Sequence, residues 1–173
     1  MDLRDLGYSL IMDAIEKVKP EAAIRNSLAL KENSLTVNEI SFSLSDFKGI
    51  YVIGFGKAGS AMAQTVEHIL GETLSGGMVI TKYGHSLPTR KIQVVEAGHP
   101  VPDKNTLRYT GELLDFIKNT PEKALIITLI SGGGSALLES LPPSISLEHL
   151  QQLTQSLLAS GADITELNTI RKH

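Results

Sequence analysis

The sequence predicts an α/β fold of three layers, with a mostly parallel sheet and extra helices at the N-terminus. Short apolar runs rich in β-branched residues recur along the chain, which is typical of strands buried on both faces of a parallel sheet. Helical patterns separate these runs at intervals of about 20 to 40 residues, which indicates βα units. Two of the runs end in glycine-rich turns, at 54–59 and 131–135. Turns in that position are where such folds bind ligands.

The first 47 residues are expected to form helices and a connector that pack on the domain. Apolar residues recur at helical spacing over 3–18. Pro20 can begin a second helix, which the apolar pattern extends to Leu30. Residues 31–47 are polar and rich in serine and asparagine. They predict a connector with one short edge strand near 40–42.

Residues 48–173 are expected to form the α/β domain itself. We predict strands over 49–53, 76–81, 92–96 and 124–130. We predict helices after Gly59, over 104–118, over 146–159 and after Asp163. N-caps are expected at Asp103, Ser146 and Asp163, and helix ends at Gly71 and Gly161. The apolar run 124–130 predicts a buried strand at the centre of the sheet.

Four polar loops are the unusual features of this pattern, and each follows a predicted strand. They lie at 54–59, 82–85, 96–103 and 131–135. Parallel strands end at the same edge of a sheet, and ligands bind outside that edge. We therefore expect the four loops to share one rim.

The loop at 131–135 has the features of an anion site. Its residues are Ser131, Gly132, Gly133, Gly134 and Ser135. Three glycines let the chain turn sharply and bring backbone N–H groups close to a ligand. A helix is expected to start at Ala136, and its orphan N–H groups and macrodipole favour negative charge. The loop is thus predicted to bind a phosphate or a carboxylate; the alternative is a turn without a ligand.

The loop Gly54-Phe55-Gly56-Lys57-Ala58-Gly59 matches the G-x-G-x-x-G fingerprint of dinucleotide-binding, Rossmann-like folds. The acidic residue that holds an NAD ribose should follow about 20 residues later, but Ile80-Thr81-Lys82 stands there. Lys57, inside the turn, suits a phosphate or a carboxylate better than a dinucleotide. The alternative is a glycine turn with a solvated lysine.

Composition excludes several classes of protein. Of the 173 residues, 42% are hydrophobic and 20% charged, as in a packed domain. The formal net charge of −3 provides no basic field for nucleic acid. The absence of cysteine excludes disulfides and thiolate metal sites and fits a reducing cytosol. No signal-peptide pattern and no membrane-length apolar run occur. His85 and His99 lack a histidine partner at metal-ligand spacing, so no protein-bound metal is expected.

Five segments of the chain together resemble a known family. They are Gly54-Phe55-Gly56-Lys57-Ala58, Thr81-Lys82-Tyr83-Gly84-His85, Glu96-Ala97-Gly98-His99-Pro100-Val101-Pro102-Asp103, Ser131-Gly132-Gly133-Gly134-Ser135-Ala136-Leu137 and Asn168-Thr169-Ile170-Arg171-Lys172-His173. In this order they resemble the N-terminal domain of the glycerate 2-kinase family, the class II glycerate kinases that are sometimes labelled hydroxypyruvate reductases. Five motifs in order are far more specific than any one of them.

The resemblance implies ATP-dependent phosphorylation of D-glycerate to 2-phosphoglycerate, with Mg²⁺. It also implies a second, C-terminal α/β domain across a cleft, which is absent from this chain. Members of the family are more than twice as long, and this chain stops inside the Asn-Thr-Ile-Arg-Lys-His motif. We therefore expect a fragment or a truncated protein that is inactive alone. Its expected partners are glycerate and ATP, rather than nucleic acid or a membrane.

The same resemblance implies roles for individual residues. Lys57 and Arg171 are the predicted catalytic residues. Lys57 would neutralise the transferred phosphoryl group or hold the glycerate carboxylate, and Arg171 would offer a planar fork to the same anions. Gly56, His99 and Asn168 would line the substrate or phosphate site beside the 131–135 loop. His99 and Glu96 lie in the neighbouring loop, and the base that takes the substrate proton is left open.

Two other functions stay open at this stage. An NAD(P)H-dependent reductase of hydroxypyruvate would use the G-x-G-x-x-G turn, with Lys82 meeting an NADP 2′-phosphate. A truncated domain that binds an anion without catalysis would expose apolar surface, which favours self-association into a homo-oligomer.

Replacement of Lys57 by alanine tests its role. In an intact two-domain enzyme, Lys57→Ala is expected to lower kcat/KM by roughly a hundredfold or more, the scale of losing one preorganised electrostatic contact. Steady-state kinetics measure this effect, and near-normal values in the variant would remove Lys57 from the mechanism.

Overall fold

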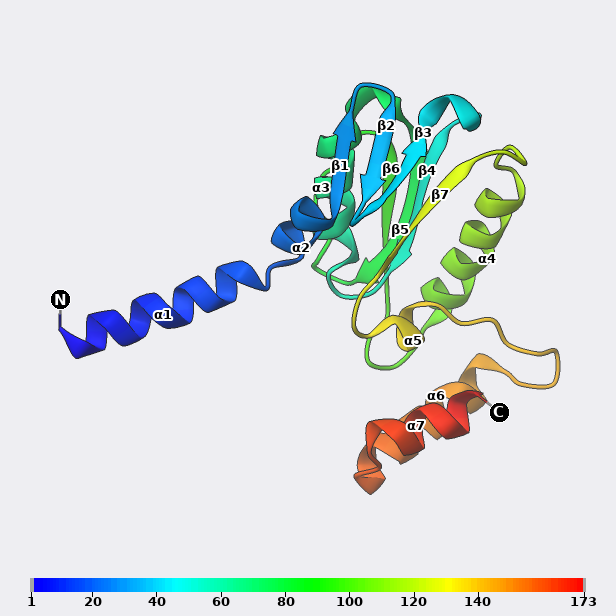
Figure 1. Ribbon diagram of the computed structural model, residues 1–173. Helices are drawn as coiled ribbons and strands as arrows, with labels where there is room; N and C mark the ends of the chain where they lie inside the picture. The colour runs from blue at the N-terminus through cyan, green and yellow to red at the C-terminus, as the bar shows by residue number, and fades with distance from the viewer. Residues whose placement is uncertain (1, 173) are drawn as a thin grey trace.

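The structure, a computed structural model, describes residues 2–172 and shows an α/β domain built on a four-stranded parallel sheet (Figure 1). Only the backbone is described at 171 and 172. The strands lie in the order β6 (Ile92–Ala97), β5 (Leu74–Lys82), β4 (Ile50–Phe55) and β7 (Leu125–Ile130). Each neighbouring pair is parallel. The predicted fold class is confirmed, and every strand predicted for the domain is present.

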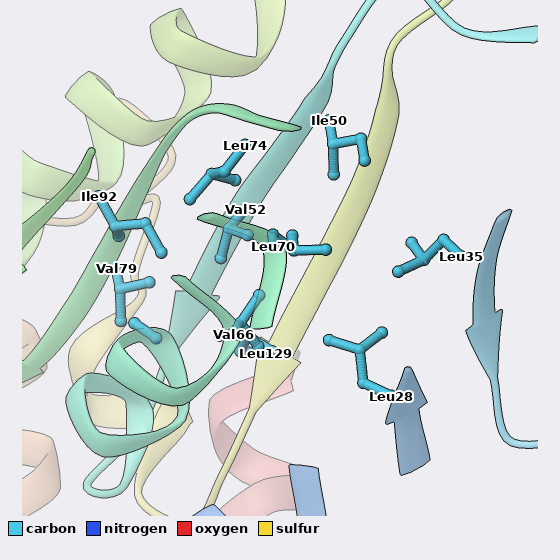
Figure 2. Close-up of a cluster of buried hydrophobic side chains, with 11 residues drawn as sticks. Leu28, Leu35, Ile50, Val52, Val66, Leu70, Leu74, Val79, Ile92 and Leu129 are labelled. Carbon is cyan, nitrogen blue, oxygen red and sulfur yellow. The ribbon is translucent and has the colours of Figure 1, made fainter. Parts of the chain in front are cut away.

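Helices cover both faces of this sheet, which gives three layers (Figure 1). α3 (Gly59–Leu70) connects β4 to β5 on one face, and α4 (Lys104–Lys118) connects β6 to β7 on the other. Side chains alternate along a strand, so neighbouring residues of β5 enter different layers. Val79 packs in the cluster beneath α3 (Figure 2), whereas Met78 and Ile80 pack in the cluster beside α4.

β7 lies at an edge of the sheet, which corrects the central position expected for 124–130. Among the described strands it pairs with β4 alone. Thr128 and Ile130 are exposed, Ile130 to 62%. The apolar run identifies a strand, but its place in the sheet depends on where the preceding crossover delivers it. Composition does not encode that position.

A small antiparallel sheet takes the place of the predicted polar connector, and the edge strand predicted near 40–42 is confirmed as its last strand. β1 (Leu28–Lys31), β2 (Ser34–Val37) and β3 (Ile40–Ser43) form two hairpins. Glu32 and Asn38 open the turns with positive φ angles of 49° and 52°. Leu28 and Leu35 point from β1 and β2 into the core around α3 (Figure 2). Apolar side chains alternate through this stretch, and that period of two was the signal for strands.

The elements next to this small sheet have boundaries that differ from the predicted ones. α2 (Pro20–Ser27) ends just before β1, and not at Leu30 as predicted, because β1 takes over the last apolar residues. A short 3₁₀ helix, η1 (Leu44–Asp46), leads from β3 toward β4. α2 packs on α3, so this part of the N-terminal region does lie against the domain.

α1 (Leu3–Lys17) forms where the apolar pattern predicts it, but the expected packing on the domain is not seen. No residue of this helix is buried, and Figure 1 shows it extending away beyond α2. Its apolar side chains stay exposed, Tyr8 to 68% and Ile11 to 61%. A helical period reports that one side is apolar, but it does not report which surface covers that side.

The connection from β5 to β6 has no helix and runs back along α3. Two side chains of α3 hold its middle. The Ser60 hydroxyl accepts a hydrogen bond from the Leu87 N–H (2.7 Å), and the Gln64 amide donates to the Pro88 carbonyl (2.9 Å). A parallel crossover this short needs such anchors, because it buries little apolar surface of its own.

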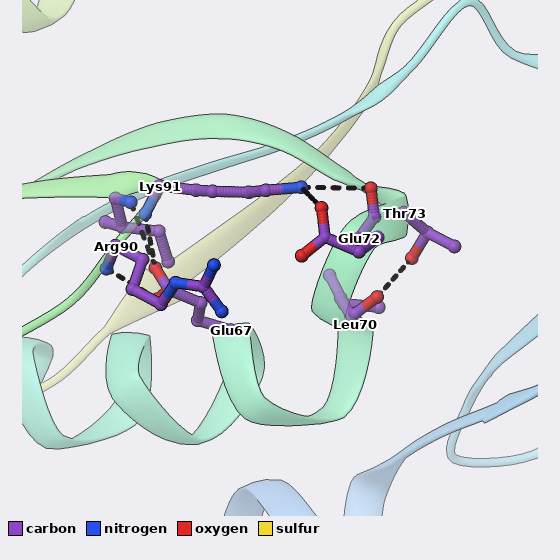
Figure 3. Close-up of polar contacts among 7 residues, drawn as sticks. Glu67, Leu70, Glu72, Thr73, Arg90 and Lys91 are labelled. Atoms are coloured by element: carbon purple, nitrogen blue, oxygen red, sulfur yellow. Dashed lines mark hydrogen bonds and ion pairs between the residues drawn. The ribbon is translucent and has the colours of Figure 1, made fainter.

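Glu67, one turn further along α3, holds the end of the same connection (Figure 3). Its carboxylate accepts hydrogen bonds from the N–H groups of Arg90, Lys91 and Ile92, at 2.6, 2.9 and 3.1 Å. Burial raises the pKa of Glu67, but these hydrogen bonds outweigh burial and lower the pKa below its usual value. Lys91 in turn pairs with Glu72 (2.9 Å) in the 3₁₀ helix η2 (Gly71–Thr73).

Three helices follow β7: the single turn α5 (Gly134–Leu137), then α6 (Leu147–Ser160) and α7 (Ile164–Lys172). The predicted cap of α6 is confirmed, because Ser146 accepts from the His149 N–H (3.2 Å). The predicted box before α7 is confirmed too. Asp163 accepts from the Glu166 N–H (2.9 Å) while the Glu166 carboxylate accepts from the Asp163 N–H (3.0 Å). None of the described helices has the length and apolarity to cross a membrane.

The substitution Leu35→Ala tests whether the small sheet belongs to the core. Leu35 is 0% exposed, so its truncation is expected to lower the free energy of unfolding by about 2–5 kcal/mol. Leu10→Ala is the matched control, because Leu10 is 60% exposed on α1 and its loss should cost less than about 0.5 kcal/mol. Urea unfolding measures both values, and equal losses would contradict the packing described for β2.

Candidate functional site

The ends of β4 and β7 meet where the strand order reverses. From β4 the chain proceeds outward through β5 to β6 and then returns to the other side of β4 as β7. Ligands of open α/β sheets bind at such a switch point. The Lys57 N–H donates to the Gly132 carbonyl (2.9 Å), and the Ala58 N–H donates to Ser131 Oγ (3.0 Å). The loops after β4 and β7 therefore meet at one rim, as predicted.

Gly56 allows the two loops to touch. Its φ is 124°, and a Cβ at this position would lie 2.2 Å from Ser131 Oγ. Its N–H donates a hydrogen bond to the Ile80 carbonyl (3.1 Å). In a dinucleotide-binding loop the second glycine leaves space for the pyrophosphate, and here Ser131 fills that space. Gly56 therefore lets the two loops pack closely, while its predicted place in the lining of the substrate or phosphate site stays a prediction.

The 131–135 loop approaches both Lys57 and His99. Gly133 has a φ of 85°, and a Cβ there would lie 2.7 Å from His99 Nε2 and 3.2 Å from Lys57 Cγ. A Cβ on Gly132 would lie 3.8 Å from Lys57 Cε. Among the described residues, no acceptor is hydrogen-bonded to the N–H of Gly132 or Gly133. Available amides beside a lysine are what an anion requires.

The helix after this loop is shorter than predicted. α5 is a single turn, and Leu138 is already extended, with φ −130° and ψ 103°. A single turn has a small dipole, so the preference for an anion comes from the amides and from lysines. Buried Ala136 and Leu137 fix the turn, and Thr106 Oγ1 of α4 donates to the Ala136 carbonyl (3.3 Å).

The rim carries positive charge without a counter-ion. Lys57 is exposed and Lys82, the last residue of β5, is half-buried. Neither lysine forms an ion pair with any residue that the structure describes. Burial lowers the pKa of His99, and the nearby Lys57 and Lys82 lower this pKa further. The imidazole is therefore neutral at pH 7, and an anion would balance the two ammonium groups.

Asp103 holds two loops of the rim together. Its carboxylate caps α4 by accepting from the Thr106 N–H (3.0 Å), as predicted. It also accepts from the Tyr83 hydroxyl (2.6 Å), which ties the loop after β5 to the loop after β6. Burial raises the pKa of Asp103, but hydrogen bonds from Tyr83, Thr106 and Gly98 outweigh burial and lower the pKa.

Glu96, like Asp103, holds a loop of the rim in place. Its carboxylate accepts from the N–H groups of His85 (3.0 Å) and Ser86 (2.9 Å), so it shapes the loop after β5. Glu96 is thus engaged in holding a loop, whereas His99 Nε2 faces the Gly133 turn. His85 itself lies exposed in its loop.

α7 carries the remaining predicted site residues. Asn168 is exposed on this helix and makes no hydrogen bond to the rim within the described residues. The side chain of Arg171 lies outside the described residues, so its catalytic role stays a prediction. Ser135 is exposed at the start of α5. α6 does reach the rim, because the Gln151 amide donates to the Pro102 carbonyl (2.8 Å).

Two surface hollows lie elsewhere, along α3 and the connection from β5 to β6. Gln64, Glu67 and Arg90 are among their lining residues. The Glu67 carboxylate there already accepts hydrogen bonds from the backbone N–H groups of Arg90 and Lys91 (Figure 3), and the Gln64 amide donates to the Pro88 carbonyl. In the part of the chain that the structure describes, no three His, Cys, Asp or Glu side chains gather as metal ligands.

Sequence reasoning missed two residues of the rim as site candidates. The sequence pattern assigns Lys82 only to an NADP 2′-phosphate and gives Tyr83 no role of its own. Both stand at the carboxyl end of the buried run of β5. That position was the available signal, because every strand of a parallel sheet delivers its last residues to the same edge.

Gly133→Ala tests the closeness of the three loops. The positive φ and the contact with His99 are expected to lower the free energy of unfolding by about 1–3 kcal/mol. Gly111→Ala is the control, because nothing lies within 4 Å of its Cβ position in α4 and alanine should stabilise that helix by about 0.5–1 kcal/mol. Urea unfolding separates them, and a neutral Gly133→Ala would contradict the geometry of the turn.

Comparison with known proteins supports a family assignment. A family model described as a domain of unknown function, DUF4147, matches residues 8–173. The "Glycerate 2-kinase" of Pyrococcus horikoshii is 40% identical over 100% of the chain, and the "D-glycerate 2-kinase" of Thermotoga maritima is 37% identical over 99% of it. A "Putative hydroxypyruvate reductase" of Agrobacterium vitis is 41% identical over 70% of it. The chain spans 38% of the length of each kinase and 28% of that reductase.

Solved structures agree with this comparison. A crystal structure of a protein from Pyrococcus horikoshii matches with a TM-score of 0.85 and 39% identity, covering 100% of this chain and 39% of that one. The crystal structure of a glycerate kinase from Thermotoga maritima matches with a TM-score of 0.78 and 36% identity, covering 99% and 38%. By the match of its residues 8–173, this chain belongs to the DUF4147 family, and the relatives it resembles along its length include glycerate kinases.

Proposed function

We propose that this chain forms the N-terminal part of a kinase that transfers a phosphoryl group from ATP to D-glycerate, giving 2-phosphoglycerate and ADP. The observation that carries this proposal is the junction of Lys57 with the glycine turn, where the Lys57 N–H binds the Gly132 carbonyl at 2.9 Å. At the switch point of the sheet, this junction has a lysine that forms no ion pair within the described residues, beside available amides. The names of the relatives supply the substrate.

Lys57 supports this chemistry through its charge. Phosphoryl transfer depends mostly on positioning and on electrostatic stabilisation of the transferred group. In this proposal the Lys57 ammonium neutralises the phosphoryl oxygens or holds the glycerate carboxylate. Its stem lies against the Gly133 turn, 3.2 Å from the Cβ position there. That contact restricts the positions that the ammonium can adopt. The side chain therefore loses less conformational entropy when a ligand binds.

The 131–135 loop supplies neutral donors in the same proposal. The amides of Gly132, Gly133 and Gly134, together with Ser135, would hold a phosphate or carboxylate. The Ser131 hydroxyl already accepts from the Ala58 N–H (3.0 Å), which supports a positioning part for it. That hydroxyl can still donate its own proton to a bound anion.

Residues from α7 complete the proposed site. We assign Arg171 the part of a planar fork for a carboxylate or phosphate, and Asn168 a supporting hydrogen bond. ATP fits the donors of the rim, since unpaired amides and lysines suit phosphate oxygens. Mg²⁺ is usually held by the phosphates and by one or two carboxylates. The rim carboxylates described here hold loops, so we assign no Mg²⁺ ligand. The absence of cysteine supports a cytoplasmic location.

A second candidate function is the reduction of hydroxypyruvate with NAD(P)H. The name of the Agrobacterium vitis relative favours it. The structure weighs against it, because Ser131 occupies the space beside Gly56 that a pyrophosphate would need. The residue at the end of β5 is Lys82, where NAD binding would call for an acid.

A binding and turnover experiment separates the two functions. ATP with Mg²⁺, D-glycerate and NADPH are titrated separately into the chain, and amide NMR signals of Lys57 and residues 132–135 are followed. Shifts are expected with D-glycerate and with ATP, because the rim offers an anion site. NADPH should need a higher concentration than ATP to saturate the same shifts, because no pyrophosphate cleft lies beside Gly56. An intact two-domain enzyme should release ADP in a coupled assay with D-glycerate. A change in nicotinamide absorbance with hydroxypyruvate would contradict the kinase proposal.

A further inference from the structure

Two lysines and a histidine come from three neighbouring strand ends. Lys57 follows β4, Lys82 ends β5, and His99 stands two residues beyond the end of β6. The register of the sheet pairs Lys82 with Ala97, so Lys82 and the His99 loop leave the sheet together. Thr81 Oγ1 donates to the Lys57 carbonyl (3.4 Å), which links the ends of β4 and β5. The three side chains thus begin at adjacent positions along the rim.

Among the described residues, the charged side chains that lower the pKa of His99 are both cationic. The charged groups acting on its ring are Lys57 and Lys82. The glycine turn against the ring, at Gly133, has no ionisable side chain. The carboxylate of the same loop, Asp103, is occupied by Tyr83 and by the start of α4. Within the described residues, neither lysine has a carboxylate partner.

We propose that Lys57, Lys82 and His99 form one anion site, in which Lys82 is a second fixed cation and His99 takes up a proton when the anion binds. The inference rests on the proposed function for the identity of the anion, a phosphoryl group or the glycerate carboxylate. What the three side chains recognise is the negative charge that both groups share.

The link between anion binding and protonation of His99 has a simple electrostatic origin. Without a ligand, protonation of His99 would add a third positive charge beside two lysines. A bound anion offsets the lysines and accepts a hydrogen bond from the imidazolium, so the same proton becomes favourable. By linkage, the anion must then bind more tightly as the pH falls, and the gain disappears where the imidazole is neutral in both states.

The test uses sulfate and D-glycerate as probes of the 173-residue chain. Sulfate stays doubly charged and D-glycerate singly charged between about pH 5.5 and 8, so only the protein titrates there. Calorimetric titration is expected to show a Kd that falls by up to about tenfold per pH unit as the pH is lowered. Lys82→Ala is expected to weaken sulfate binding about tenfold, the loss of one charge-assisted contact. His99→Gln should abolish the dependence on pH.

Two control variants make the same substitutions, lysine to alanine and histidine to glutamine, at positions away from the rim. Lys118→Ala removes one positive charge at the last turn of α4, where the lysine is 74% exposed. His68→Gln removes a histidine from the last turn of α3. Both should keep the affinity and the pH dependence of the parent chain. A loss in Lys118→Ala equal to that in Lys82→Ala would reduce the effect to net charge and overturn the assignment of Lys82.

A measurement on the unaltered chain decides the matter even where a variant does not fold. The imidazole NMR signals of His99 are followed against pH with and without saturating sulfate, and the midpoint should move upward with sulfate. An unmoved midpoint, or a Kd that is constant with pH, overturns the inference. Linked binding of sulfate without any binding of D-glycerate would support the inference while contradicting the proposed substrate.

Discussion

Two hydrogen bonds at the switch point of the sheet determine the rest of the site. The Lys57 N–H binds the Gly132 carbonyl, and the Ala58 N–H binds Ser131 Oγ across 73 residues of sequence. They bring the loop that starts α3 against the loop that follows β7. The glycine turn then lies beside the lysine stem and beside His99. The arrangement of amides, lysine and imidazole at the rim depends on this contact between the two loops, and within the described residues the Lys57 ammonium has no ion partner.

The acidic and the basic side chains of the rim have different roles. The acids, Asp103 and Glu96, accept hydrogen bonds from Tyr83 and from the loop amides, so their charge stabilises structure. The bases, Lys57 and Lys82, have no such partner among the described residues. The chain as a whole carries −3, yet two lysines at this edge have no carboxylate partner among the described residues. Local arrangement, and not net charge, gives the preference for anions.

The sequence could predict elements but not their placement. The strands of the parallel sheet, the extent of α4 and the cap at Asp103 follow from periods and capping chemistry that act over a few residues. The edge position of β7, the exposure of α1 and the pairing of β1 to β3 depend on contacts between distant segments. The shared rim could be predicted because parallel topology aligns strand ends. The role of Gly56 could not, because it depends on Ser131, which lies beside Gly56 only in the folded chain.

The edge position of β7 has a consequence for how the protein associates. Its strand reads Leu-Ile-Ile-Thr-Leu-Ile, without a charge or a proline, and its outer side has no strand partner in the described chain. Natural proteins protect such borders with lysine, proline or a covering helix, because a bare ladder of N–H and C=O groups templates cross-β assembly. A segment or partner that covers the outer side of β7 would therefore protect the protein against strand-to-strand aggregation.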